Sequence, residues 1–267
     1  MDVKTNVYGT QPKEILKKNF LRWIYSNTVA EELDNCTESQ LDFLKSQIDS
    51  SFANTETYLC VAIKFSRLDT VKDLVERLKA NVYHRDAYGK SLLFKACQST
   101  VDTAKKIRYL ASNFPKLFLL RTHESQSLPV HIAALQPCTD AIQAILELDA
   151  GMVNARKQFL STPLHLSARH NRIDVVQLLT DLARTNVNLR DLNGDTAAHN
   201  AALHEHIDCL AAIVARSDFQ RSIRNRHYRT YMDVLEGHLH TKYVNRLFIR
   251  AEIYKHKKRS LRKARDL

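Results

Sequence analysis

The chain has 267 residues with 44% hydrophobic content, and its 40 Lys and Arg against 29 Asp and Glu give a formal net charge of +11. No transmembrane segment is expected, because the longest uninterrupted apolar run, Cys209–Ala215, is far shorter than the roughly 20 residues that cross a bilayer as a helix. The first residues lack the apolar stretch of a secretory signal and the five cysteines are scattered, which favours an intracellular protein with free thiols in the cytoplasm, the nucleus or both.

Two helical stripes of apolar residues lie within residues 1–50: Leu16, Phe20, Trp23 and Ile24, and then Leu41, Leu44 and Ile48. Thr37, with Gln40 three residues later, has the form of a capping box at the start of the second stripe. A stack of repeats exposes an apolar face at its end, so we expect residues 1–50 to form an N-terminal helical cap.

A sequence motif recurs through residues 51–250 at intervals of 34 residues, with one interval of 37. Its copies start at Thr57, Ser91, Leu128, Thr162, Thr196 and Thr230. In four copies an Asp follows twelve residues after the start, and apolar residues at helical spacing follow the Asp: Asp69, Asp140, Asp174 and Asp208. Each copy is therefore predicted to be two helices, the second capped by this Asp, with a turn leading to the next copy.

These units resemble ankyrin repeats, which open with Thr-Pro-Leu-His-x-Ala, and the resemblance is most specific within residues 157–200, at Thr162-Pro163-Leu164-His165. The resemblance implies an all-α ankyrin-repeat solenoid of about six helix-turn-helix repeats, with a helical N-terminal cap and a basic C-terminal helix. The copy at Ser91 departs from the pattern, because about one helical turn is inserted near Pro115. The glycines that the family has after each helix are mostly absent.

Residues 251–267 are predicted to form a basic C-terminal helix or tail. Residues 216–267 hold 15 Lys and Arg against 5 Asp and Glu, so nearly all of the excess positive charge lies in the last fifth of the chain. Five residues resemble a nuclear-localisation cluster: Lys257, Lys258, Arg259, Arg262 and Lys263. Binding of nucleic acid or of an anionic membrane through this tail are the alternative interpretations.

The predicted turn tips supply the first candidate partner-binding residues, because the tips line the partner-binding surface in ankyrin proteins. Four arginines recur six residues before a repeat start: Arg85, Arg156, Arg190 and Arg224. Arg85 and Arg190 each have a neighbouring Asp with which to pair, whereas Arg156 and Arg224 have none and are the better binding candidates. Tyr88 and Phe159 belong to the same predicted surface.

Two columns of histidines recur with the repeats. The resemblance implies that the first column is structural, bonding backbone near the turns: His131, His165 and His199. The second column ends the first helices, with Arg169 beside its first member: His170, His204 and His238. The second column is interpreted either as solvated polar residues or as a concave strip that gains positive charge below about pH 6.5 and prefers an acidic partner.

Catalysis, cofactors and metal ions are not expected. Only five glycines occur, and the closest two are 43 residues apart, so no local glycine-rich loop exists for a nucleotide. Cys97, Cys138 and Cys209 fall on apparent helices among apolar residues, where a free Cys is usually a buried hydrophobe. The sequence therefore predicts a non-enzymatic scaffold or adaptor that binds a protein partner along the turn tips and the concave face, and an acidic partner is one interpretation of its charges. Two alternatives stay open: a nuclear or nucleic-acid-associated regulator that uses the tail, and a bacterial ankyrin effector that acts on host proteins.

Overall fold

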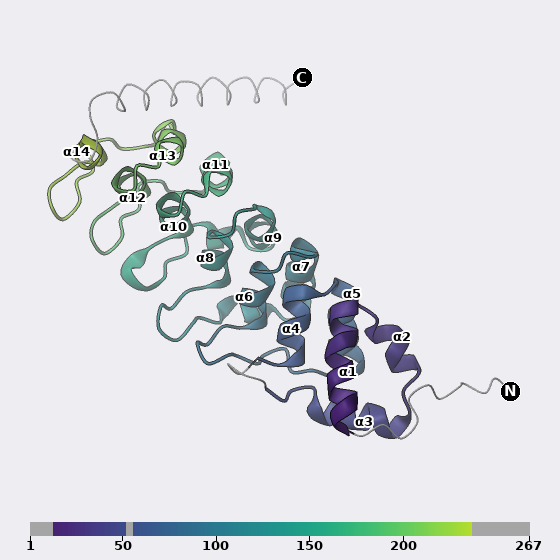
Figure 1. Ribbon diagram of the computed structural model, residues 1–267. Coiled ribbons are helices and arrows are strands. Elements are labelled where there is room, and N and C mark those ends of the chain that lie inside the picture. Colours follow the sequence, from purple (N-terminus) through teal and green to yellow (C-terminus); the bar gives the residue numbers. More distant parts are fainter. Residues whose placement is uncertain (1–12, 52–55, 237–267) are drawn as a thin grey trace, which may run out of the picture. The chain divides into compact units, whose positions relative to one another are not determined.

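The structure is a computed structural model that describes residues 13–51 and 56–236, and the secondary structure within these ranges is helical (Figure 1). By its internal contacts the chain divides into two compact units, residues 1–124 (unit 1) and residues 125–267 (unit 2). None of the helices in the described ranges is long and apolar enough to span a membrane.

Unit 1 begins with α1 (Lys13–Ser26), α2 (Val29–Asp34) and α3 (Glu38–Gln47). The predicted capping box is present at α3, where the Thr37 hydroxyl accepts from the Gln40 backbone N–H and the Gln40 side chain accepts from the Thr37 backbone N–H at 2.9 Å. Helix α2 was not expected, because only Val29 and Leu33 of its six residues are buried, too few to give a recognisable stripe. Helix α1 contacts α4, the first helix of the repeats, so its apolar face covers that helix.

Each repeat contributes a first helix that starts one residue after its predicted position. These helices are α4 (Tyr58–Phe65) and α6 (Leu92–Cys97) in unit 1, and α8 (Pro129–Ala133), α10 (Pro163–Arg169), α12 (Ala197–Leu203) and α14 (Tyr231–Glu236) in unit 2. Alanines such as Ala168, Ala201 and Ala202 are fully buried along them. These small side chains let α10 and α12 pack closely, and α12 contacts α14 in the same row (Figure 1).

The second helices follow the same register. They are α5 (Leu68–Lys72), which continues as the π-helix η2 (Asp73–Arg77), α7 (Thr103–Asn113), α9 (Asp140–Leu148), α11 (Ile173–Asp181) and α13 (Ile207–Val214). In unit 2, α11 contacts α13, so these helices form a second row beside α10 and α12 (Figure 1). The insertion expected near Pro115 is a 3₁₀ helix, η3 (Pro115–Leu119), which follows directly on α7.

The predicted N-cap role of the recurring Asp is wrong. Helices α5, α11 and α13 begin one residue before it and α9 begins at it, so these Asp residues lie in the first turn. The residues at the N-cap positions make no capping hydrogen bond through their side chains: Arg67, Thr139, Arg172 and His206. A carboxylate in the first turn is still favourable, because it interacts with the positive end of the helix dipole.

Turn tips join each second helix to the next first helix; they comprise residues 81–90 and 121–124 in unit 1 and 125–127, 154–161, 186–195 and 220–229 in unit 2. Two short 3₁₀ helices, η4 (Ala150–Asn154) and η5 (Gln158–Leu160), lead into and form part of the second tip of unit 2. Backbone hydrogen bonds join neighbouring tips in unit 2: the Leu192 N–H donates to the Phe159 carbonyl at 2.8 Å, and the Arg226 N–H donates to the Asn193 carbonyl at 3.0 Å. The tips of unit 2 therefore form one continuous row.

One position in each tip has a left-handed backbone, two residues before the repeat start. Gly89 and Gly194 occupy it with φ of 75° and 76°, but other tips place Gln126, Leu160 and Tyr228 there with φ of 49°, 60° and 59°. A side chain in this conformation costs roughly 1–2 kcal/mol relative to the right-handed region, whereas glycine adopts it freely. Three tips therefore carry backbone strain that a glycine would remove.

Replacing Tyr228 by glycine should raise the free energy of unfolding by about 0.5–1 kcal/mol, the relief of strain minus the greater chain entropy of glycine in the unfolded state. Urea unfolding of the full chain, followed by circular dichroism, measures the difference. Arg229→Gly is the control in the same tip, because Arg229 does not have a positive φ. A Tyr228→Gly chain that is no more stable than the native chain would show that the Tyr228 side chain compensates for its backbone.

Candidate partner-binding surface

The first histidine column holds each repeat to the next. In unit 2 the His165 Nδ1 accepts from the Thr162 backbone N–H at 3.3 Å, and its Nε2 donates to the Asp195 carbonyl at 3.1 Å. His131 and His199 make the same pair of bonds, with Nε2 donating to the carbonyls of Ala155 and Arg229. The structural role that was predicted for these histidines is confirmed.

Two of the candidate arginines hold neighbouring tips together. Arg190 Nε donates to the Gly194 carbonyl at 3.1 Å, and its Nη2 donates to the Arg224 carbonyl in the next tip at 2.8 Å. Arg85 makes the equivalent bonds in unit 1, to the carbonyls of Gly89 and Arg121. Their guanidinium groups thus bond carbonyl oxygens of the tips, where the sequence suggested pairing with the neighbouring Asp.

The neighbouring Asp residues have a different task. Asp191 accepts from the backbone N–H groups of Asn193 and Asp195, and so closes its own tip. Asp86 closes the equivalent tip of unit 1 through the N–H groups of Tyr88 and Lys90. The carboxylates therefore satisfy backbone donors in the turn, which explains why they recur beside the arginines.

Arg156 and Arg224 are both exposed, as the binding interpretation requires. Arg224 Nη1 donates to the Tyr228 carbonyl at 2.6 Å and lies 3.8 Å from the carboxylate of Asp233 in α14. The sequence argument missed this partner because it considered only adjacent acids. An ion pair this exposed contributes little to stability, so Arg224 keeps most of its capacity to bind a partner.

Large apolar side chains are exposed on the tips beside these arginines. Tyr88 in unit 1 is 58% exposed, and Phe159 and Tyr228 in unit 2 are 60% and 81% exposed. Leu160 and Leu192 in unit 2 are exposed as well. Aromatic residues and Arg are the residue types enriched at the energetic centres of protein interfaces. Tyr228, Leu160 and Leu192 were not among the sequence candidates. For Tyr228 and Leu160 the sequence did contain an indication, because a large residue stands two residues before the repeat start, where other repeats have Gly.

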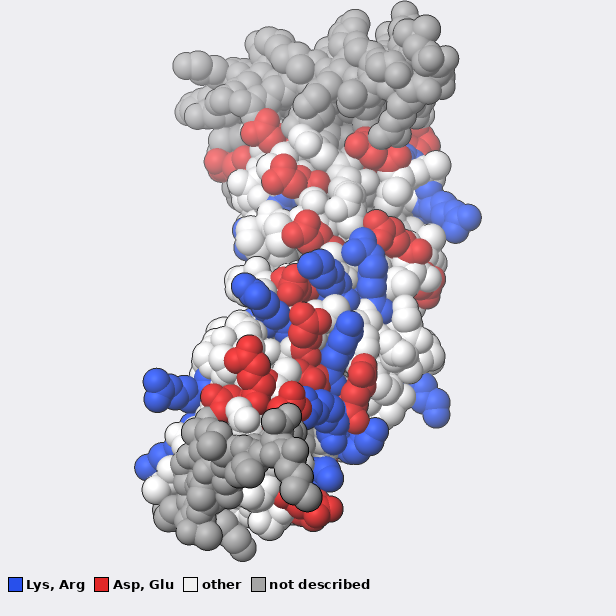
Figure 2. All heavy atoms as spheres, turned by 90° about the vertical axis from the view of Figure 1, so that its right-hand side faces the viewer, with Lys and Arg blue, Asp and Glu red and all other residues white. Residues whose placement is uncertain are grey.

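The second helices of unit 2 and two of its turn tips carry opposite charges. Helices α9, α11 and α13 carry acidic residues and no Lys or Arg: Asp140, Glu147, Asp174, Asp181 and Asp208. Figure 2 shows one face of the molecule, on which acidic and basic side chains are interspersed. The tips at 154–161 and 220–229 carry the opposite charge and no Asp or Glu: Arg156, Lys157, Arg221, Arg224, Arg226 and Arg229. The tip between them, at 186–195, carries Arg190 together with Asp191 and Asp195.

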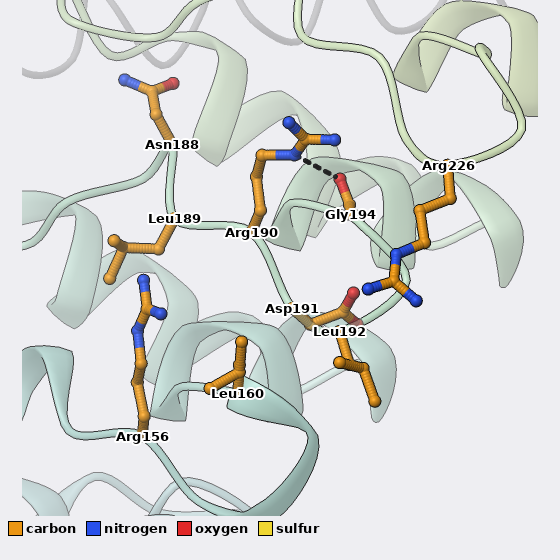
Figure 3. A pocket seen from close by; sticks show the side chains of 9 residues that line it. All are labelled: Arg156, Leu160, Asn188, Leu189, Arg190, Asp191, Leu192, Gly194 and Arg226. Atoms are coloured by element: carbon orange, nitrogen blue, oxygen red, sulfur yellow. Dashed lines mark hydrogen bonds between the residues drawn. The ribbon is translucent and has the colours of Figure 1, made fainter.

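The tips of unit 2 enclose an open hollow of about 530 Å³. It is lined by residues of three successive tips: Arg156, Leu160, Asn188, Leu189, Arg190, Asp191, Leu192, Gly194 and Arg226 (Figure 3). Arg156 and Arg226 stand on opposite sides of the view, with Leu160 and Leu192 between them. The hollow thus has an aliphatic floor with a guanidinium group on each side.

The second histidine column lies beside other cations. His170 and His204 end α10 and α12, and the ring of His204 stacks on that of His206 with centroids 5.8 Å apart. Partial burial, together with the charge of Arg169, lowers the pKa of both His170 and His204 below the usual value. For His170 and His204 the expected charging below about pH 6.5 is therefore corrected, because their lowered pKa values shift it to a lower pH.

Several predicted residues lie outside the described ranges. They are His238 of the second column and the nuclear-localisation-like cluster of Lys257, Lys258, Arg259, Arg262 and Lys263. The roles proposed for them stay predictions.

The cysteines of the described ranges have no disulfide partner. Cys97 and Cys209 are buried, and burial raises the pKa of the Cys97 thiol and raises that of Cys209 to about 12. Such thiols are almost entirely protonated at neutral pH and are poor nucleophiles. Cys138 is exposed between α8 and α9, so its predicted place on an apolar helix is wrong. Within residues 13–51 and 56–236, no three His, Cys, Asp or Glu side chains converge as a metal site would require.

Part of the chain matches a known protein family, and solved structures share its fold. Residues 130–224 match the family described as ankyrin repeats in three copies. The ankyrin repeat domain of Bcl-3, a member of the IkappaB protein family, is 22% identical, with a TM-score of 0.61 over 85% of this chain and 94% of its own. The human ASB11 ankyrin repeat domain is 17% identical, with a TM-score of 0.63 over 86% of this chain and 96% of its own.

A third similar structure is the complex of the predatory endopeptidase Bd0816 from Bdellovibrio bacteriovorus with the immunity protein Bd3460. Its matching chain is 16% identical, with a TM-score of 0.58 over 74% of this chain and 97% of that chain. No curated protein matches the sequence. The chain carries ankyrin repeats, and its fold is that of an ankyrin-repeat solenoid. Ankyrin repeats generally mediate protein–protein interactions and generally form non-enzymatic scaffolds.

Proposed function

We propose that this protein is a non-enzymatic interaction module whose unit 2 binds an acidic region of a protein partner through its turn tips. The opposite charges of the second helices and of two turn tips in unit 2 carry the proposal. These two tips carry six cations and no acid, whereas the second helices carry only acidic charge. An acidic partner is attracted to these tips and repelled from the second helices, so the charges orient the partner as it approaches.

The residues at the strained positions support the same surface. Tyr228 and Leu160 occupy left-handed positions that glycine would fill without strain, and both side chains are exposed. A strained backbone that supports an exposed side chain is typical of a site where the side chain has a function. Together with Phe159, these residues supply the apolar contact area that charge attraction alone lacks.

Reversing two tip charges should weaken partner binding several-fold while leaving folding intact. Arg156→Glu together with Arg229→Glu changes two exposed cations of unit 2. Because exposed charges contribute little to stability, we expect the thermal midpoint to move little. The measurement is quantitative affinity capture from a nuclease-treated lysate, in which each captured protein is compared between the variant and the native chain, followed by titration of the purified captured proteins.

The matched control is Lys45→Glu together with Lys105→Glu, which makes the same change in net charge in unit 1, at side chains 48% and 69% exposed. We expect the acidic proteins among those captured to be lost with the tip variant and retained with the control. Equal loss with both variants would show that only the net charge matters, and unchanged capture with the tip variant would contradict a tip surface.

A further inference from the structure

The hollow between the tips of unit 2 offers apolar surface, and most of its polar lining already makes hydrogen bonds within the tips. The Asn188 amide donates to the Asp218 carbonyl at 2.7 Å, and its oxygen accepts from the Gln220 N–H at 2.9 Å. Arg190 bonds the carbonyls of its own and the next tip, and Asp191 closes its turn. The apolar surface of the hollow is that of three leucines on its floor, Leu160, Leu189 and Leu192.

Cations stand at both sides of this floor. The Arg226 guanidinium has no hydrogen-bond or ion-pair partner among the residues that the structure describes, and its side chain is exposed. Arg156 is exposed on the opposite side of the hollow (Figure 3). Neither the tip of Arg156 nor that of Arg226 contains an Asp or Glu. A ligand that fits here therefore has an apolar centre between two negative charges.

We propose that the hollow binds a short extended segment of a partner protein in which one apolar side chain is flanked by acidic residues. The apolar side chain rests on Leu160 and Leu192, and the flanking carboxylates pair with Arg156 and Arg226. The hollow, at about 530 Å³, is large enough for a leucine-sized side chain and the peptide backbone on either side of it. This inference rests on the proposed function, since it names the segment that the tip surface recognises.

A peptide fits this hollow better than a nucleic acid does. Binding of single-stranded nucleic acid uses aromatic platforms on which bases stack, and base recognition uses available donors and acceptors. The floor here is aliphatic, and the Asn188 amide is already hydrogen-bonded. Guanidinium groups bind carboxylates in a fork geometry, which suits Asp or Glu at fixed positions along an extended chain.

Synthetic peptides test the inference by fluorescence anisotropy with the full chain. The probe is a labelled nine-residue peptide with a central leucine flanked by alternating Asp and Glu; its counterparts have a central alanine, or Lys in place of each acid. Labelled oligo-dT is the nucleic-acid probe. Leucine should bind about tenfold or more tightly than alanine, the effect of burying one leucine side chain, and the Lys peptide should not bind.

Two variants locate the binding. Leu192→Asp and Arg226→Glu should each weaken the leucine peptide about tenfold or more. Arg221→Glu is the matched control, because Arg221 is an exposed cation in the same tip as Arg226 that does not line the hollow; its effect should be at most about threefold. Circular dichroism checks that each variant is folded.

Three outcomes overturn the inference. The first is equal binding of the leucine and alanine peptides, together with equal effects of Arg226→Glu and Arg221→Glu. It would mean that the tips attract acidic chains by diffuse charge. The proposed function would then still hold, but the hollow would not be the binding site. Tighter binding of oligo-dT that Arg226→Glu abolishes would assign the hollow to nucleic acid. The third outcome is that no acidic peptide binds. If the captured acidic proteins still bind through the tips, this outcome would contradict only the proposed role of the hollow. If they do not, it would contradict both proposals.

Discussion

Lys95→Ala should lower the free energy of unfolding of unit 1 by about 3–5 kcal/mol, because it leaves the buried Asp86 carboxylate without its cation. Lys95 lies in α6 and is 2% exposed, and its Nζ is 2.9 Å from both Asp86 and Glu56. Burial alone would raise the pKa of the Asp86 carboxyl, but hydrogen bonds from Lys95 and from the turn N–H groups hold that pKa below its usual value. Removing Lys95 therefore affects the tip that Asp86 closes as well as α6.

Lys64→Ala is the matched control for this prediction. Lys64 binds the same Glu56 carboxylate, but its side chain is 28% exposed. Solvent screens an ion pair in that position, so we expect a loss below about 1 kcal/mol. Urea unfolding at pH 7 measures both variants. Equal losses for the two lysines would show that burial of Lys95 is not the source of its contribution, and a loss below 1 kcal/mol for Lys95→Ala would contradict the role of the buried pair.

His165→Ala should lower the free energy of unfolding of unit 2 by about 2–4 kcal/mol, from a cavity and from two unpaired backbone groups. The imidazole is almost fully buried and bonds the Thr162 N–H and the Asp195 carbonyl, so its loss disconnects neighbouring repeats. His170→Ala is the control at the C-cap of the same helix, α10, because its side chain is exposed. A change within about 0.5 kcal/mol is expected for His170.

The pH dependence of the free energy of unfolding tests the role of His165 independently. Burial lowers the pKa of His165, against the opposing effect of the Asp195 carbonyl and of the Asp191 and Asp195 charges. Below its ordinary pKa of about 6.5 the unfolded state therefore binds a proton more readily than the folded state does. Native stability should fall as the pH drops through this value towards 5, and His165→Ala should reduce that slope. An unchanged slope would mean that His165 binds a proton equally readily in the folded and unfolded states.

Much of the fold followed from the sequence because its period is local. The starts at Thr57, Thr162 and Thr196 lie one residue before the observed helices α4, α10 and α12. Positions that were predicted from a cap rule were less accurate, as the Asp residues of the second helices show. A carboxylate is favourable at the N-cap and also in the first turn, so composition alone does not locate the helix start to within one residue.

The candidate surface was predicted only in part. Arg85 and Arg190 were identified from their recurrence, but their bonds to carbonyls in the following tip, 36 and 34 residues away, require the stacked repeats. Tyr228 and Leu192 were missed because their exposure depends on how the tips project. Lys95 was missed as well, because a lysine in a first helix is normally expected to be solvated. Only the structure shows the two carboxylates that surround it.

By itself the sequence determined the repeat, its helical class and the structural histidines, because these depend on periodic contacts within about one repeat length and on a motif with fixed spacing. Only the tertiary structure decided which charged residues bind within the protein and which face a partner. Stacking brings groups from successive repeats to within hydrogen-bond distance, as with Arg190 and the Arg224 carbonyl. It also gathers Arg156, Leu192 and Arg226 around one hollow, although two repeats separate the first from the last.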